Sequence, residues 1–294
     1  MGMVKIIGVQ QKRGTPAAGR TRGAPAAAAR SAGREDPAFA TTLARGMAVL
    51  EAFGPGARML GNSEIAGRIG LPRPTVARLT HTLAELGYLR YDPAQAKYRL
   101  WTRILALAHP LLASMAVRQA ARPLMQELAE SVRGAVSLGV LDGTDLVYVE
   151  TSRAGDVGAH TPDIGSTVPL ARAAMGRALV SMLTAGEAQE VERRIAGATP
   201  EIWSAYGEAL REGVRQCAER GFCVSRGDWV AEVHAAGAPL FRGRGGECFA
   251  INCGIPAFRL RSRQLEEEVG PRLVALAGSI RALMEQRGHG RADG

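Results

Sequence analysis

The sequence SEIAGRIGLPRPTVARLTHTLAEL, from Ser63 to Leu86, decides the fold of the amino-terminal part of this chain. It predicts a short helix over Ser63–Ile69, a turn at Gly70-Leu71-Pro72 and a second helix over Pro74–Leu86. Proline suits the start of the second helix, because its missing N–H group would have no partner there in any case. Two helices joined by a tight turn are typical of the helix-turn-helix, whose second helix fits the major groove of DNA.

Segments on both sides complete a small domain. Upstream, apolar residues at helical spacing through Ala40–Phe53 predict an amphipathic helix that ends at Gly54-Pro55-Gly56. Downstream, Tyr88–Tyr91 and Lys97–Leu100 flank a turn-forming stretch and predict a hairpin, the wing. We therefore expect a winged helix-turn-helix domain over residues 39–100. The apolar positions expected in its core are Leu43, Met47, Leu50, Phe53, Ile65, Ile69, Val76, Leu79, Leu83 and Leu86.

Residues that face away from this core are candidates for contact with DNA. The start of the second helix, with Thr75 and the flanking Arg73, offers hydroxyl and N–H groups to a phosphate. Arg78 can reach a guanine edge or a backbone oxygen, and cations on the hairpin would lie against a neighbouring phosphate run or the minor groove. A solvated face of an ordinary helical bundle carries similar residues, but the ordered combination of helices and basic hairpin favours DNA binding. The candidate DNA-binding residues are Ser63, Arg73, Pro74, Thr75, Ala77, Arg78, His81, Arg90 and Lys97.

Length and charge agree with this interpretation. A chain of 294 residues is long enough for two domains, and its net charge of +9 suits a polyanionic partner. No apolar run approaches the ~20 residues that cross a bilayer, and the amino terminus lacks a signal-peptide pattern. We therefore expect a cytoplasmic protein without a membrane partner. Residues 1–38, rich in Ala, Gly, Pro and Arg, are expected to be a disordered basic tail, and residues 289–294 a flexible tail.

The sequence beyond the hairpin predicts a second, larger domain. Residues 101–116 are expected to form a helical linker in which Pro110 marks a bend or break. From residue 117 to 288 strand and helix signals alternate, and Asp142-Gly143 is a strong hairpin turn signal. Successive hairpins, rather than βαβ crossovers, favour a mainly antiparallel sheet flanked by helices. The expected fold class is therefore α+β.

Motifs in both domains make the chain similar to a known family. In the first domain they are Ser63–Leu79, Leu83–Tyr88 and Lys97–Leu100. In the second domain, in the family's order, they are Val140–Gly143, Val147–Val149, Gly165-Ser166, Pro169-Leu170, Gly176–Leu179, Gly221-Phe222 and Ala238–Phe241. On these residues the chain, over about Ala40–Arg287, resembles the IclR family of bacterial transcriptional regulators.

The resemblance implies a regulator rather than an enzyme. It implies a GAF-like effector-binding and oligomerisation domain over residues 117–288, a small organic acid as effector, and homodimers or tetramers on near-palindromic, double-stranded operator DNA. Symmetry also has a physical reason, since one winged domain touches few base pairs and two half-sites multiply affinity and selectivity.

The resemblance also implies where the effector binds. The family's anion-binding backbone falls on Ala174 and Met175, near a helix start whose free N–H groups attract a carboxylate. Where the family often carries polar or acidic side chains this chain has Ala135 and Ala235, a departure that bears on which acid fits. Arg172 is either a cationic partner for a carboxylate or a residue that points to solvent. The matching positions on the facing strands are Ser225, Val233, Ala235, Asn252 and Gly254.

Other classes of protein fit parts of the sequence. A cysteine-dependent hydrolase could use Asp228, His234 and Cys253, but Cys253 lies within a strand pattern and no orienting third group has suitable spacing. Zinc binding by His234 with Cys223 or Cys253 lacks local ligand spacing. A nucleoid-type structural protein would need only the tail and the winged domain. We expect no catalytic residue, cofactor or metal, and we expect buried thiols at Cys217, Cys223, Cys248 and Cys253.

Overall fold

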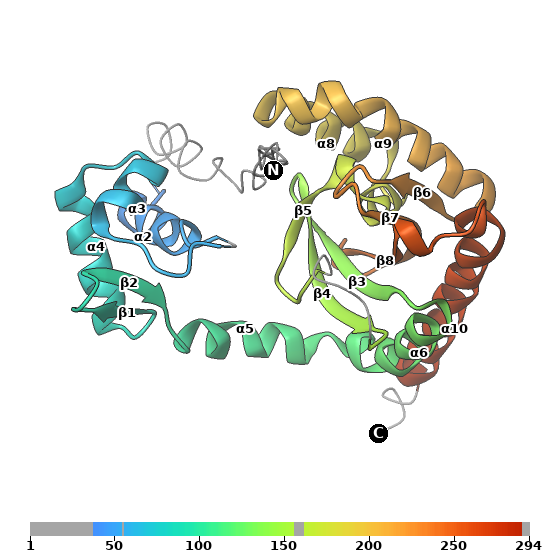
Figure 1. The fold of residues 1–294 in the computed structure, drawn as a ribbon, viewed down its shortest axis with the longest axis horizontal. Coiled ribbons are helices and arrows are strands. Elements are labelled where there is room, and N and C mark those ends of the chain that lie inside the picture. Colours follow the sequence, from blue (N-terminus) through green and yellow to red (C-terminus); the bar gives the residue numbers. More distant parts are fainter. Residues whose placement is uncertain (1–37, 55, 156–161, 290–294) are drawn as a thin grey trace, which may run out of the picture. The chain divides into compact units, whose positions relative to one another are not determined.

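The computed structural model of the chain describes residues 38–54, 56–155 and 162–289. Nearly all of the tails expected at residues 1–38 and 289–294 lies outside the described residues. The chain divides into two compact units, residues 1–108 and 109–294, and each combines helices with an antiparallel sheet (Figure 1). The predicted α+β class is confirmed. The domain boundaries expected from the sequence stay predictions.

The first unit contains the helices and the hairpin expected around the Gly70 turn. Its core joins Val49, Ile65, Val76 and Leu89, one residue or more from each of its helices and from the hairpin. The hairpin is antiparallel, and Leu60 extends it through an isolated bridge to Tyr98. Its elements are α2 (Thr41–Glu51), α3 (Asn62–Ile69), α4 (Arg73–Glu85), β1 (Leu89–Asp92) and β2 (Lys97–Leu100).

The prediction that every residue of the apolar stripe is buried is wrong for three residues of this unit, Leu43, Met47 and Leu86. Leu43 is 67% exposed, and Met47 is exposed as well, because α2 turns a different face, Ala48, Val49 and Ala52, toward the core. Leu86, at the carboxy-terminal cap of α4, is 50% exposed.

A helix without buried residues crosses the boundary between the two units. This helix, α5 (Arg103–Ser114), contains Pro110 and lies in the region expected to be a helical linker. The next helix, α6 (Ala116–Val132), buries one face in the second unit. Among the described residues no single helix is long and apolar enough to span a membrane. Only α5 and α6 together pass that test of length and composition, and they are bent by 83° at the break between them.

The second unit is built on one six-stranded sheet in the order β5-β4-β3-β8-β7-β6, with every neighbouring pair antiparallel. The mainly antiparallel sheet is therefore confirmed. The strands are β3 (Ala135–Asp142), β4 (Asp145–Arg153), β5 (Thr167–Pro169), β6 (Cys223–Arg226), β7 (Val233–Arg242) and β8 (Cys248–Pro256). The short strand β5 was not expected.

Helices cover both faces of this sheet (Figure 1). On one face α6 and the carboxy-terminal helix pack on Val136, Ala236 and Cys253. On the other face α7, backed by α8 and α9, packs on Tyr148 and Ala250. These helices are α7 (Ala174–Val180), α8 (Ala185–Ala198), α9 (Pro200–Arg220) and α10 (Gly270–His289), with a 3-10 turn at Leu170–Arg172 and a π-helical turn at Leu265–Val269.

Candidate nucleic-acid interface and ligand site

The helix α4 is held in place by one polar contact and by its buried stripe. Thr80 is fully buried, and its hydroxyl donates to Asn62 Oδ1 at 2.9 Å, at the first residue of α3. Between the two helices Gly70 has φ +63°, a left-handed conformation that glycine adopts without strain. Sequence reasoning missed Thr80, since a threonine inside an amphipathic helix gives no sign of a partner eighteen residues away.

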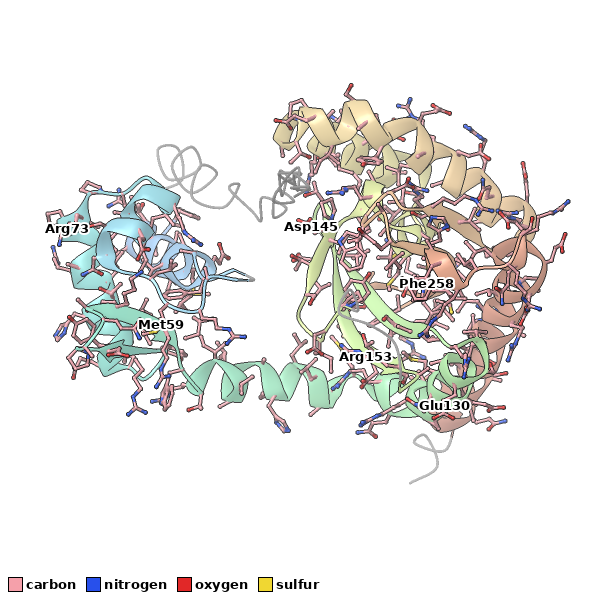
Figure 2. The ribbon with its side chains drawn as sticks, in the orientation of Figure 1. Met59, Arg73, Glu130, Asp145, Arg153 and Phe258 are labelled. Atoms are coloured by element: carbon pink, nitrogen blue, oxygen red, sulfur yellow. The ribbon has the colours of Figure 1, made fainter. Side chains whose placement is uncertain are left out.

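The predicted outward face of α4 is largely exposed. Arg73, which Figure 2 labels at the start of α4, is exposed together with Pro74, Arg78 and His81. Thr75 and Ala77 were expected to face outward but are half-buried. Ser63, on α3, is exposed. The helix thus presents Arg78 and His81 away from the buried Val76 and Thr80, and it exposes Arg73 at its first residue.

The hairpin presents two arginines that are fixed by an aromatic ring. Arg90 and Arg99 are register partners on β1 and β2. Their guanidinium groups lie 4.4 Å and 5.1 Å from the ring centroid of Trp101. Such stacking orders both cations while leaving their N–H edges available to an anion. No pattern in the sequence indicates this role for Trp101.

The third cation of the hairpin has a different environment. Lys97 Nζ lies 3.0 Å from Glu64 Oε1, and Glu64 Oε2 accepts a hydrogen bond from the Gly61 N–H at 2.7 Å. The Gly61 bond, followed by Lys97, lowers the pKa of Glu64. Lys97 therefore fastens the hairpin to the start of α3, and part of its charge is already neutralised.

The predicted ligand site lies on the face of the sheet that α7 covers. Ser225, Ala235 and Gly254 are register partners on three adjacent strands, and Ala135 on β3 continues the row. All four are small, so this part of the sheet carries little side-chain bulk. Val233 is half-buried on the same face of β7.

The next row of the sheet lies under the beginning of α7. It contains Gly237, Asn252 and Ser137, again as register partners. A Cβ atom at Gly237 would overlap the backbone of Ala174 and Met175, so only glycine allows this approach. The structure therefore brings Ala174 and Met175 next to the row that contains Asn252.

Asn252 is the one candidate ligand residue with an unsatisfied polar atom among the described residues. The side chain is 8% exposed, and its Oδ1 atom is buried without a hydrogen-bond partner. The Asn252 side chain is hydrogen-bonded to Tyr148. Burial raises the pKa of Tyr148 well above its ordinary value, although the bond from Asn252 opposes that shift. A buried, unpaired acceptor costs free energy unless a ligand or ordered water satisfies it.

Two other residues of this region, Ser225 and Arg172, make contacts that stabilise the fold. The Ser225 hydroxyl donates to Asp228 Oδ2 at 3.0 Å, and the buried Arg177 pairs with the same carboxylate at 2.5 Å. Arg172 does not simply point to solvent, and its role as a cationic partner for a carboxylate stays a prediction. Its guanidinium donates to the carbonyl oxygens of Asp228 and Trp229 at 2.9 and 2.8 Å, so it fastens the loop after β6.

Asp228 and Cys253, two residues of the hydrolase hypothesis, lie on opposite faces of the sheet. Asp228 bonds Ser225 and Arg177 on the α7 side, whereas Cys253 is buried in the core under α6 and α10. Cys223 lies on the α7 side, whereas His234 lies on the opposite face of β7, so these two residues cannot bind one metal ion. Within the described ranges no group of three or more His, Cys, Asp or Glu residues could hold a metal ion. All four cysteines are free and buried, as expected.

We expect Cys253 to resist alkylation in the folded protein. Complete burial raises the pKa of its thiol to about 12, and the reactive species is the thiolate. Iodoacetamide at pH 8 should leave Cys253 unmodified in native protein, as read by mass spectrometry of its tryptic peptide, and should modify it in urea. Rapid labelling of the native protein would show that this core opens.

Comparisons with known proteins all point to one protein family. Residues 42–93 match the family described as IclR helix-turn-helix domain, and residues 109–282 match the bacterial transcriptional regulator IclR C-terminal family. The chain is 28% identical to the Pca regulon regulatory protein of Pseudomonas putida, over 83% of this chain and 84% of that protein.

Solved structures show the same likeness. An IclR family transcriptional regulator from Brucella abortus is 38% identical, with a TM-score of 0.76 over 85% of this chain and 94% of that one. An IclR homologue from Microbacterium hydrocarbonoxydans, complexed with 4-hydroxybenzoate, has the same fold, with 24% identity and a TM-score of 0.63 over 81% of this chain and 97% of that one.

Proposed function

Because this chain belongs to the IclR family of bacterial transcriptional regulators, we propose that it binds a near-palindromic operator through α4 and the β1–β2 hairpin and that a small organic acid modulates this binding. The chain is a transcriptional regulator with an amino-terminal helix-turn-helix domain and a carboxy-terminal effector domain. Its relatives are regulators, not enzymes.

The exposed face of α4 is the observation that carries the proposal for DNA. Arg78 and His81 lie on a helix whose other side is fixed by Val76 and by the Thr80–Asn62 hydrogen bond, and Arg73 is exposed at its first residue. A rigid, cationic helix of this kind positions base contacts, while cations on the wing supply contacts to phosphates. In this proposal Arg90 is a stronger phosphate ligand than Lys97, because Glu64 already neutralises part of the lysine's charge. Ser63, Pro74, Thr75 and Ala77 complete the proposed surface.

A symmetric operator requires more than one copy of the chain, and we propose a homodimer or tetramer. The first unit exposes several large apolar side chains that its small core does not cover, and a second copy would bury such residues. They are Leu43, Met47, Leu86, Leu105 and Leu107. In this proposal residues 101–116 connect the winged domain (39–100) to the effector domain (117–288) and transmit the effect of the ligand.

For the effector we propose a small carboxylic acid, bound between the start of α7 and the facing strands. Support comes from the small side chains along the row through Ala235 and Gly254, and from the unsatisfied oxygen of Asn252. The carboxylate would bind the backbone N–H groups of Ala174 and Met175. Because α7 has only seven residues, direct hydrogen bonds matter more here than a helix dipole. The 4-hydroxybenzoate in the Microbacterium homologue belongs to the proposed class of ligand.

One experiment tests both halves of the proposal. Selection of random duplex DNA by the full chain should enrich a sequence with approximate twofold symmetry, and an acid that binds should change the affinity for that duplex. By reciprocity the acid must then bind the DNA complex and the free protein with different affinities. Binding that is steep in salt and lacks sequence preference would instead favour a nucleoid-type protein. Equal affinity of the acid for both states would contradict coupling.

A further inference from the structure

The polar groups on the sheet beneath α7 define what kind of ligand satisfies them. Asn252 lies between Gly237 and Ser137, and Tyr148 lies opposite Gly139 one row away on the same face. Both side chains are almost completely buried, Tyr148 at 2% exposure. Because Asn252 Oδ1 has no partner, its Nδ2 is the atom that donates to the Tyr148 oxygen.

Asn252 Oδ1 receives no hydrogen bond from the residues beside it in the row. The Thr151 hydroxyl donates to Ser137 Oγ at 3.1 Å, and the Cys223 thiol donates to the carbonyl oxygen of Ala174 at 3.2 Å. Both donors are thus directed away from Asn252. On the other side of the pair, Tyr148 is buried and keeps its proton, and its oxygen already accepts from Asn252. The pair therefore offers one acceptor, Asn252 Oδ1, and one donor, the Tyr148 O–H.

Only some chemical groups complement one acceptor and one donor at the same time. A carboxylate or an ether oxygen accepts but cannot donate, so it would leave Asn252 Oδ1 unpaired. An ammonium group donates but cannot accept from Tyr148. A hydroxyl does both with a single atom.

On the basis of the proposed effector site, we infer that the effector carries a hydroxyl group besides its carboxylate and that the Asn252–Tyr148 pair binds this hydroxyl. Asn252 Oδ1 accepts its hydrogen bond, and Tyr148 donates one to its oxygen. The pair thereby separates hydroxy acids from acids that lack the hydroxyl, since a site built to bond a hydroxyl loses that bond with the simpler acid. The carboxylate contacts at Ala174 and Met175 would be common to both kinds of acid.

Matched acids test this inference in the full chain. Calorimetric titrations would compare benzoate with 3- and 4-hydroxybenzoate and their methyl ethers, and butyrate with 3-hydroxybutyrate. In at least one set the hydroxy acid should bind about tenfold or more tightly than both its parent acid and its ether, as expected for one buried hydrogen bond gained. In Asn252→Leu this ratio should fall close to one. The milder variant Tyr148→Phe, which removes only the donor, should reduce it.

Thr151→Val is the matched control, because it removes a hydroxyl from the same row without touching the pair. It should keep the preference for the hydroxy acid. If acids bind without such a preference, or if the preference persists in both variants of the pair, the inference is wrong while the proposed carboxylate site stands. If no acid of either kind binds, the carboxylate effector itself is wrong and the inference falls with it. Should Asn252→Leu fail to fold, Tyr148→Phe decides between these outcomes.

Discussion

Replacing Arg78 by alanine is expected to weaken binding to the selected operator by about tenfold or more. The guanidinium lies on the exposed face of α4, and loss of one base-edge contact from arginine costs about 1–3 kcal/mol. Because a symmetric operator contains two half-sites, each dimer would lose the contact twice. Fluorescence anisotropy with the selected duplex at fixed salt measures the change, and mismatched duplexes show whether selectivity falls as well.

Arg193→Ala provides the matched control for Arg78. It removes the same charge from an exposed arginine, on α8 of the other unit. Operator affinity should be nearly unchanged in this variant. Equal affinities of the wild type and Arg78→Ala would exclude Arg78 from the interface. An equal loss in both variants would mean that only the total charge matters.

Gly176→Ala is expected to destabilise the effector domain by about 2 kcal/mol or more, although alanine normally favours a helix over glycine by about 1 kcal/mol. Gly176 is buried in α7, and a Cβ atom there would lie 2.5 Å from Leu170 Cα and overlap the Leu170 carbonyl group. Backbone atoms cannot rotate away, so α7 must shift from the sheet. Urea denaturation followed by far-ultraviolet circular dichroism measures the loss.

The opposite result is expected for Gly186→Ala. Gly186 lies on α8 and is exposed, and a Cβ atom added there would have no neighbouring atom within 4 Å among the described residues. Without a steric penalty the helix propensity of alanine should raise stability by about 0.5–1 kcal/mol. If both substitutions stabilise the protein, the contact between α7 and the Leu170 backbone is looser than the structure describes.

Much of the fold follows from short stretches of sequence. The turn at Gly70, the helices around it, the hairpin between Tyr88 and Leu100 and the turn at Asp142-Gly143 all have their cause within a few neighbouring residues. The face of a strand is also local, because alternate residues point the same way. That alternation was enough to assign Ala235 and Asn252, with their two-residue neighbours, to one face of each strand before any packing was known.

The sequence was less informative where two faces of the same helix could each be buried in the core. The stripe through Leu43 and Met47 has helical spacing, yet α2 buries Ala48 and Val49 instead. A core of three short helices covers only one side of each, and in α2 that side carries Ala48 and Val49. Spacing alone cannot rank two apolar faces of the same helix.

By itself, the sequence determined the helix-turn-helix, the hairpin, the antiparallel sheet and the family, because periodicity and turn chemistry act between near neighbours. Only the tertiary structure decided that Lys97 pairs with Glu64, that Arg172 fastens the loop after β6, and that Asn252 bonds Tyr148 yet keeps an unpaired oxygen. Each of these contacts joins residues far apart in the chain. Folding of the whole chain brings such partners together, so their hydrogen bonds leave no local pattern in the sequence.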